Sequence, residues 1–395
     1  MTTLITDHVP SMTSAATWHS VHVYYHDGLD ELILDAARPL FEGLDPAVVQ
    51  AYWVRHWRRG PHLRLNLRTT RRVFTERVWP VMEQELRGYL AAHPSTTLLD
   101  ERAETARHQR LADAEWELGP LSPWIPNNSV RVEPYDARLH ALGGPSSADL
   151  LAEFHTGTTG LAFSMLAAVR AGADRLSLAL NLMFAYAQVT MPEGIRRGYQ
   201  SYFSHASGYL AHRAGPEATR AAFDHCYQRN RDRLADQLAA VLDTVDGTGT
   251  AAFVPEWLSL VRHYQGRAEK LIASRAISFD HLADQPQAST QPEAQSWRPT
   301  TVVDRLGANQ AWQREIGDSG WFSRHRLVLN YQYLLLNRLG ITPGQRYLLC
   351  HLAASTVQEV FGVSAAAAFE EYMAAHPNPE DPEPPERTHH ATTVR

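Results

Sequence analysis

The alternation of residues 61–68 constrains the fold more than any other feature of the chain. The segment reads PHLRLNLR, in which Leu63, Leu65 and Leu67 alternate with polar side chains. Because successive side chains of a strand point to opposite faces of a sheet, this pattern predicts a strand with an apolar core face and a polar face. Residues 18–25 and 52–57 are further strand candidates, rich in aromatic and β-branched side chains, and residues 129–132 are a shorter one.

Helical periodicity replaces these strands from residue 146 onward, and it also marks residues 28–42 and 70–92. The predicted helices of the second half are 146–155, 160–170, 174–189, 216–242, 256–272, 301–316, 322–338 and 343–360. Strands that precede a run of helices favour an α+β fold over a doubly wound sheet. We therefore expect an N-terminal, mainly antiparallel sheet with flanking helices, followed by a largely helical half.

A single domain is expected over residues 17–375, strand-rich as far as residue 145 and helical beyond it. Residues 1–16 and the Pro- and Glu-rich residues 376–395 are expected to be a disordered lead-in and a disordered tail. The polar, Pro-containing stretch 282–300 is expected to be a mobile loop within the helical part.

Charge and cysteine content argue against several classes of protein. The net charge of −6 disfavours a nucleic-acid partner, because phosphate binding needs a basic surface. The only two cysteines are far apart, so neither a disulfide framework nor a structural zinc site is expected. The N-terminus has no basic segment followed by an apolar one, and no run of about 18 apolar residues occurs. We therefore expect a cytoplasmic protein with no membrane partner.

Motifs for common cofactors are missing. The chain has no GxxxxGKS/T, no strand-linked GxGxxG, no HExxH and no GxSxG. We therefore expect no cofactor, whether nucleotide or flavin, and no obligate metal. An enzyme built from this chain would work by positioning its substrate and through acid–base side chains.

Three segments resemble the C-terminal elimination domain of lantibiotic dehydratases. Residues 52–68, YWVRHWRRGPHLRLNLR, are similar to the family's aromatic–Arg strand, short turn and His-Leu-Arg strand. Residues 135–144, YDARLHALGG, resemble a run that ends in Arg-Tyr-Gly-Gly, and residues 333–338, YLLLNR, resemble a late His-Met-x-x-Asn-Arg helix. In order and spacing the resemblance covers about residues 18–360.

Two segments are more similar to the stand-alone pyridine synthases of thiopeptide biosynthesis, which are relatives of that domain. Residues 199–210, YQSYFSHASGYL, resemble their Ser-x-x-Ser-His-Ala pattern, and residues 329–352 resemble their Leu-Asn-Tyr-x-Tyr run and the Leu-Cys-His-Leu beyond it. Where the eliminating enzymes carry their late His and the Arg that binds a glutamyl ester, this chain has Tyr333 and Ala141, and Arg138 replaces a Glu. Alanine cannot bind a carboxylate, which needs a charged partner.

The resemblance therefore implies a cofactor-independent enzyme that catalyses a formal (4+2) cycloaddition. Two dehydroalanines of one modified peptide would combine after an adjoining amide tautomerises to an iminol. Loss of water and of the leader peptide would then give a pyridine-centred macrocycle. The implied partner is an azole- and dehydroalanine-bearing precursor peptide with an acidic leader, and a homodimer is compatible with the sequence.

The proton transfers of this reaction are assigned to polar side chains in the resembling segments. Tyr331, Tyr333, Ser204 and His205 are the catalytic candidates, because hydroxyl and imidazole groups both donate and accept hydrogen bonds. Ser204 and His205 are adjacent, so they do not face each other as a nucleophile–base pair. Tyr331 and Tyr333, two apart on a helix, cannot face one pocket. The substrate-binding candidates are Arg55, His62, Arg64, Ser201, Asn330 and Asn337.

Each of these assignments has a structural alternative. Asn330, Tyr333 and Asn337 form a polar stripe on one face of an apolar helix, which is either a satisfied buried network or a site. His205 is either a core histidine or part of that site. The polar face of residues 61–68 is either exposed or, as the resemblance implies, lines the substrate cavity.

Eight arginines lie within residues 55–77, against one acidic side chain, Glu76. This Arg-rich stretch is either a solvated basic face or a dock for an acidic leader peptide. The leader-binding candidates are Arg58, Arg59, Arg68, Arg71 and Arg72.

Two other functions stay open. A split elimination domain, which forms dehydroamino acids from glutamylated Ser or Thr, needs the missing His and Arg. A non-catalytic module that binds the leader peptide needs only the Arg-rich stretch and an aromatic strand. A buried polar stripe in the helical half would be superfluous for such a module.

Overall fold

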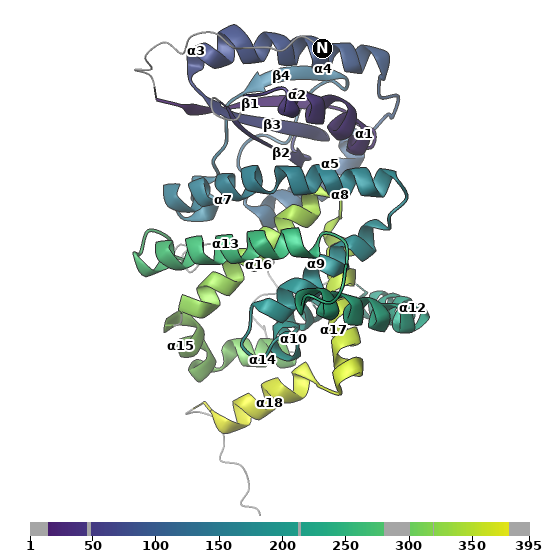
Figure 1. Ribbon diagram of the computed structural model, residues 1–395, viewed down its shortest axis with the longest axis vertical. Coiled ribbons are helices and arrows are strands. Elements are labelled where there is room, and N and C mark those ends of the chain that lie inside the picture. The colour runs from purple at the N-terminus through teal and green to yellow at the C-terminus, as the bar shows by residue number, and fades with distance from the viewer. Residues whose placement is uncertain (1–14, 46–48, 212–214, 280–300, 319, 379–395) are drawn as a thin grey trace, which may run out of the picture.

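The computed structural model describes residues 15–45, 49–211, 215–279, 301–318 and 320–378. The expected lead-in up to residue 14, the expected loop 282–300 and the expected tail from residue 379 lie outside these ranges. Figure 1 shows the sheet at one end of the molecule and the helices stacked beyond it. Strands precede the helical half in the chain, so the predicted α+β class is confirmed.

Four antiparallel strands form the sheet: β1 Thr17–Tyr24, β2 Gln50–His56, β3 His62–Thr69 and β4 Ser129–Glu133. Their order is β2-β3-β1-β4. The register places Leu65 of β3 opposite Val21 of β1 and Trp53 of β2. All three side chains are fully buried, so the leucine face of β3 is the core face that its alternation predicted.

Two helical segments pack into the core beside the sheet, and both contain a π-helical turn. The first runs from α1 Leu29–Leu32 through η1 Ile33–Ala37 to α2 Arg38–Glu42. The second runs from α3 Arg71–Val73 through η2 Phe74–Val78 to α4 Trp79–Ala92. A proline follows each π turn within two residues, Pro39 in α2 and Pro80 in α4. Because proline cannot donate a backbone hydrogen bond, the wider turn lies where the helical bonding pattern has to change.

The second face of the sheet is polar but closed to solvent. His62, Arg64 and Asn66 on β3 are only 0%, 7% and 4% exposed. The segment that follows α5 (Glu101–Glu115) covers part of this face: its Glu117 lies 3.7 Å from Arg64, and the N–H of its Ile125 donates to the Arg59 carbonyl at 3.0 Å. Neither α5 nor this cover was predicted. The alternation of β3 identified which face of the sheet is polar, and the segment after α5 helps to bury this face.

Helices make up most of the remaining described chain. They are α6 Leu139–Leu142, α7 Pro145–Gly157, α8 Thr159–Arg170, α9 Arg175–Val189, α10 Ile195–Gly198, α11 Gln200–Ala211, α12 Pro216–Val245, α13 Val254–Ala273, α14 Val302–Ala308, α15 Gln310–Asp318, α16 Gly320–Arg338, α17 Pro343–Phe361 and α18 Ala365–Ala375. The predicted helix 301–316 is interrupted at Asn309, and α18 was not predicted. Within the described chain no single helix could cross a membrane by length and hydropathy; α17 and α18 pass only as a pair, across a bend of 81°.

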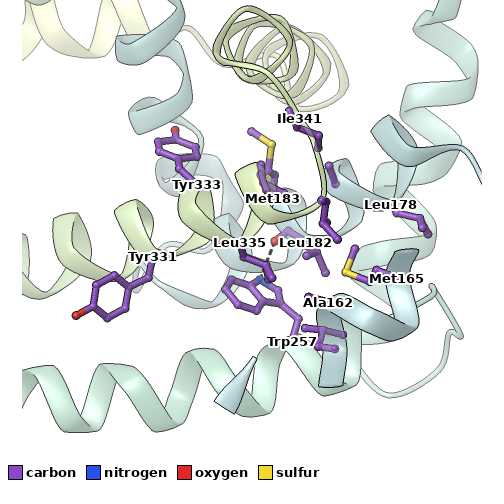
Figure 2. Close-up of a cluster of buried hydrophobic side chains, with 14 of the residues drawn as sticks. Ala162, Met165, Leu178, Leu182, Met183, Trp257, Tyr331, Tyr333, Leu335 and Ile341 are labelled. Atoms are coloured by element: carbon purple, nitrogen blue, oxygen red, sulfur yellow. Dashed lines mark hydrogen bonds between the residues drawn. The ribbon is translucent and has the colours of Figure 1, made fainter. Parts of the chain in front are cut away.

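Helix α9 is the centre of the helical half. Its residues 178–187 are all buried except Asn181, and α12, α13 and α17 pack around it. A helix that is apolar on nearly all sides belongs in a core. Trp257 of α13 donates its indole N–H to the Leu182 carbonyl of α9 at 3.1 Å, and Figure 2 shows this bond beside Leu335 of α16. The same packing holds α16 in place for the site described next.

Candidate active site

Helix α16 carries the two candidate tyrosines into different surroundings. Tyr331 and Tyr333 are both buried, and Figure 2 shows their side chains leaving the helix on different sides. Tyr331 packs against Phe154 of α7, with ring centroids 4.7 Å apart. Tyr333 instead contacts α11 and α17. Two positions span about 200° of a regular helix, so the predicted separation follows from helix geometry.

Tyr333 and His205 are directly hydrogen-bonded. The Tyr333 hydroxyl lies 2.7 Å from Nδ1 of His205 on α11 and 3.4 Å from Sγ of Cys350 on α17. The Arg346 guanidinium lies over the Tyr333 ring, 5.0 Å from its centroid. Three helices therefore contribute to one set of side chains, which we call the Tyr333 group: Tyr333, His205, Cys350 and Arg346.

Burial controls the protonation of the Tyr333 group. It lowers the pKa of His205 to about 4, with a further contribution from the positive charges of Arg346 and Arg326. Burial also raises the pKa of Tyr333 well above its usual value and that of Cys350 to about 11. Imidazole, phenol and thiol are therefore all uncharged at neutral pH. This state suits groups that hand over a proton and take it back, and it does not suit an anionic nucleophile.

Ser201 lies one helical turn before His205 and contacts a histidine that was not predicted. Its Oγ is 2.8 Å from Nε2 of His325 on α16. The Tyr186 hydroxyl of α9 donates to the His325 carbonyl at 2.9 Å. Burial lowers the pKa of His325 to about 4, and His205 is the second cause. The Ser201–His325 pair therefore adjoins the Tyr333 group.

The other candidates of the helical half stand apart from this group. The Ser204 hydroxyl donates to the Gln200 carbonyl in its own helix at 2.9 Å. Asn330 is exposed, so the expectation of a buried stripe through Asn330 is wrong. Asn337 is half-buried, and its Oδ1 accepts no hydrogen bond from the described residues. Besides its two tyrosines, α16 buries the polar side chains of His325, Gln332 and Arg338.

Arg338 joins the end of α16 to the rest of the fold. This 1% exposed side chain donates to the His155 carbonyl at 3.0 Å and to the hydroxyls of Thr158 and Thr159, both at 2.9 Å. Its guanidinium lies 4.6 Å from the ring centroid of Trp53 on β2. Burial lowers its pKa to about 9. Arg338, the second residue of the Asn-Arg pair in the resembling motif, therefore has a packing role.

The polar face of the sheet holds two more substrate-binding candidates. Arg64 Nε donates to His62 Nε2 at 3.1 Å, and His62 Nδ1 donates to the Gly60 carbonyl at 2.8 Å. An imidazole that accepts at Nε2 is neutral, and burial, His56 and Arg64 keep the pKa of His62 well below its usual value. His22 of β1 stacks on His62, with ring centroids 4.8 Å apart.

One carboxylate lies beneath this polar face. The side chain of Glu117, two residues beyond α5, is 1% exposed. Its oxygens lie 3.3 Å from Arg58, 3.7 Å from Arg64 and 3.8 Å from Arg138, and 3.6 Å from His56 Nε2. The Arg-rich stretch thus has a buried acidic partner about 50 residues further along the chain.

The Arg-rich stretch divides into engaged and exposed side chains. Arg55 forms an ion pair with Asp30 and donates Nε to the Arg338 carbonyl at 2.8 Å, so it ties β2 to the end of α16. Arg59 donates to the Pro123 carbonyl at 2.9 Å. The exposed leader-binding candidates are Arg68, Arg71 and Arg72, of which Arg72 also donates Nε to Glu76 at 3.0 Å.

An aromatic row joins the sheet to α16. Tyr52 of β2 stacks on His155 of α7, with ring centroids 5.0 Å apart, and the neighbouring Phe154 contacts Tyr331. Tyr331 therefore lies on the side of α16 that faces the sheet. The two candidate tyrosines thus lie in separate places, Tyr331 beside α7 and Tyr333 beside α11 and α17. No set of three or more His, Cys, Asp or Glu side chains in the described part of the chain is arranged to hold a metal ion.

The chain is similar to known proteins over most of its length. The sequence model of the lantibiotic biosynthesis dehydratase C-terminal family matches residues 18–357. The solved structure of TbtD, the pyridine synthase from thiomuracin biosynthesis, covers 88% of this chain and 99% of its own, at 34% sequence identity and a TM-score of 0.70. The solved structure of TsrL covers 90% of this chain and 98% of its own, at 24% identity and a TM-score of 0.66, and shares the fold. No curated protein matches the sequence.

Proposed function

This chain belongs to the lantibiotic biosynthesis dehydratase C-terminal family, and we propose that within this family it is a pyridine synthase of thiopeptide biosynthesis. The observation that carries the proposal is the similarity to TbtD, at 34% identity, along nearly the whole of both chains. Tyr333 supports it, because the eliminating enzymes that the chain resembles have a histidine at this place.

The proposed reaction joins two dehydroalanines of one modified precursor peptide. The amide beside one dehydroalanine gains a proton on oxygen and loses one from nitrogen, which gives an iminol and hence a 2-azadiene. The alkene of the second dehydroalanine closes the ring through two new carbon–carbon bonds. The hydroxyl then leaves as water and the leader peptide leaves as its amide, so that a pyridine remains within a macrocycle.

Positioning is the larger part of this catalysis. Holding two reacting groups in register contributes about 7–11 kcal/mol in well-oriented intramolecular reactions. A positioned acid–base group typically adds about 10²- to 10⁴-fold in rate. The enzyme therefore depends first on the shape that surrounds the peptide and second on individual proton donors.

We assign the proton transfers to Tyr333 and His205. The raised pKa of Tyr333 keeps its hydroxyl protonated, so that it can donate to the amide oxygen that becomes the iminol. The lowered pKa of His205 keeps its imidazole neutral, so that it can accept a proton and return it. Their 2.7 Å hydrogen bond lets one group be restored as the other reacts. Ser201 and His325 hold the adjoining turn of α11 against α16.

We assign leader binding to the exposed arginines of the Arg-rich stretch. Arg68, Arg71 and Arg72 present positive charge to solvent, which suits an acidic leader. A substrate made on ribosomes also favours a cytoplasmic location for the enzyme.

The alternative functions are less favoured by the same residues. A split elimination domain has to bind a glutamyl ester, and Ala141 replaces the arginine that its relatives use. A module that only binds peptide has no need of the Tyr333 group, in which three helices bring buried polar side chains together.

Incubation with a dehydrated, azole-bearing precursor peptide that TbtD accepts tests the proposal by mass spectrometry. A synthase yields a macrocycle and a leader amide whose masses add up to that of the precursor less one water. Conversion of a glutamylated peptide to a dehydrated one would identify an elimination domain instead. A folded protein that binds the leader but leaves every peptide mass unchanged would identify a binding module.

A further inference from the structure

The cluster beneath the sheet carries more positive charge than its carboxylate balances. Arg58, Arg64 and Arg138, which we call the arginine cage, face the single carboxylate of Glu117. Burial and the charge of Arg64 hold the pKa of His56 well below its usual value, so this fourth neighbour adds no charge at neutral pH. Three guanidinium groups against one buried carboxylate leave two positive charges without a buried counter-ion.

Nearby acidic groups do not close this gap. The Glu115 carboxylate accepts the indole N–H of Trp57 at 3.1 Å, and only the backbone carbonyl of Glu115 contacts Arg138. Asp136 is exposed, and its carboxylate accepts the backbone N–H of Arg138 at 2.9 Å. The cage is therefore electropositive and reaches the surface, since the Arg58 and Arg138 side chains are 24% and 30% exposed and that of Arg64 is 8% exposed.

The contacts inside the cage stop short of hydrogen bonds. The shortest distances from Glu117 oxygens to the three arginines are 3.3, 3.7 and 3.8 Å, whereas a charge-assisted hydrogen bond measures about 2.7–2.9 Å. Both Glu117 oxygens, Arg64 Nη2 and Arg138 Nε are buried and make no hydrogen bond among the described residues. Arg58 Nη1 itself donates to the Leu118 carbonyl, whereas Arg64 Nη2 and Arg138 Nε lie beside a carboxylate that does not satisfy them.

An exposed turn brings Glu117 into the cage. Trp116 has left-handed backbone geometry at φ 52°, and Gly119 has φ 99°. Between them Leu118 is 59% exposed. A side chain at position 119 would place its Cβ 3.0 Å from an Arg58 nitrogen, so glycine lets the turn lie close to the cage. The residue that fills the site is therefore attached to a surface turn and not to a packed helix.

We propose that the arginine cage binds a carboxylate of the peptide substrate, an Asp or Glu side chain of its leader, and that Glu117 occupies the site until that carboxylate replaces it. The proposal rests on the proposed peptide substrate. Guanidinium forks match the two oxygens of a carboxylate, and an incoming side chain free of the turn can close contacts that Glu117 leaves open. Exchanging one carboxylate for another also keeps the buried charge constant, so the arginines are never left without a counter-ion.

Fluorescence anisotropy of fluorescein-labelled hexaglutamate tests the site in the full-length protein, with hexaglutamine as the uncharged counterpart. Glu117→Gln keeps the size of the side chain and removes its charge, and Glu117→Ala empties the position. We expect both variants to bind hexaglutamate at least about fivefold more tightly than wild type, because no carboxylate has to be displaced. Hexaglutamate should also raise the melting temperature of Glu117→Ala more than that of wild type.

Arg58→Gln is the loss-of-site variant, and Arg110→Gln is its matched control. Arg110 is an exposed arginine of α5 outside the cage, so the two variants change the net charge equally. Arg58→Gln alone should weaken hexaglutamate binding and abolish the gain of Glu117→Gln. Equal affinity of wild type and Glu117→Gln, or equal losses in Arg58→Gln and Arg110→Gln, would overturn the proposal. These experiments measure binding and not turnover, so their outcome does not depend on whether the protein cyclises a peptide. If Glu117→Ala does not fold, the affinity of Glu117→Gln alone tests the proposal.

Discussion

Replacing Tyr333 with phenylalanine separates the chemistry of its hydroxyl from the packing of its ring. The ring stays beneath Arg346 and against α11, and only the contacts to His205 at 2.7 Å and to Cys350 at 3.4 Å are lost. If the hydroxyl protonates the amide oxygen, kcat should fall by about 10²-fold or more. This factor corresponds to about 2.7 kcal/mol of transition-state stabilisation. Leader affinity should stay unchanged, because no leader-binding candidate touches the group.

The same change also has a cost in folding stability. Removing the hydroxyl leaves His205 Nδ1 without its Tyr333 partner, and a buried unsatisfied polar atom costs about 1–3 kcal/mol. In a protein of a few hundred residues, 1 kcal/mol shifts the melting temperature by about 2–4 °C. Tyr333→Phe should therefore remain folded at assay temperature, which makes its kcat interpretable.

Tyr331→Phe is the matched control, since it removes a hydroxyl from the same helix two residues away. The Tyr331 hydroxyl is buried and has no hydrogen-bond partner among the described residues, so its loss should leave kcat and melting temperature near wild type. Single-turnover cyclisation followed by mass spectrometry, with thermal melts of each variant, makes the comparison. A Tyr333→Phe protein that cyclises at the wild-type rate would refute the assignment, and a slow Tyr331→Phe protein would transfer it to Tyr331.

Three other outcomes are expected. Leader binding measured by anisotropy should weaken as salt rises, because exposed charges are screened over about 8–10 Å, and Arg71→Gln with Arg72→Gln should flatten that dependence; binding that ignores salt would contradict the electrostatic role. Folding lowers the pKa values of His205 and His325 from 6.5 to about 4, so the unfolded chain takes up protons first as pH falls. The free energy of unfolding from urea titrations should therefore be level above pH 6.5 and decrease as pH falls from 6.5 to 4. A free energy that stays level through this window would contradict the prediction. Added EDTA, nucleotide or nicotinamide should leave the cyclisation rate unchanged, whereas activity lost to EDTA and restored by one metal would reveal a metal requirement.

The elements with a clear period were predictable, and those without one were not. The alternating segment 61–68 corresponds to β3 within one residue, and α9 and α16 begin and end within two residues of their predicted bounds. Helix α5, ERAETARHQRLADAE, has no continuous apolar stripe, so periodicity gives no signal for it. It forms at the surface, where an Asp100 side chain accepts the N–H of Arg102 and caps its first turn. A helix cap alone is a weak signal in the sequence. Because α5 was not predicted, the segment after it that covers part of the polar face of the sheet was not predicted either.

The candidate site was predictable residue by residue but not as an arrangement. His205 and Tyr333 were both chosen from the segments that carry the resemblance, and their contact joins positions 128 residues apart. Helix geometry excludes a shared pocket for Tyr331 and Tyr333, but it cannot say which of them meets α11, because that depends on how whole helices pack. The sequence pattern therefore identifies the apolar and polar faces of each helix, but only tertiary packing decides which faces contact each other.

The polar face of β3 shows the functional consequence of this limit. Alternation separates His62 and Arg64 from the leucines, and from sequence the polar side could equally be an exposed face or a cavity wall. Glu117, about 50 residues away, resolves the choice by burying that face under a carboxylate which three arginines share. A charge pattern read along one segment counts only the acids of that segment, so it predicted a free basic surface where the fold buries part of the charge. The exposed Arg68, Arg71 and Arg72 should therefore differ in salt dependence from Arg58 and Arg64 of the cage, although the sequence presents all five as one cluster.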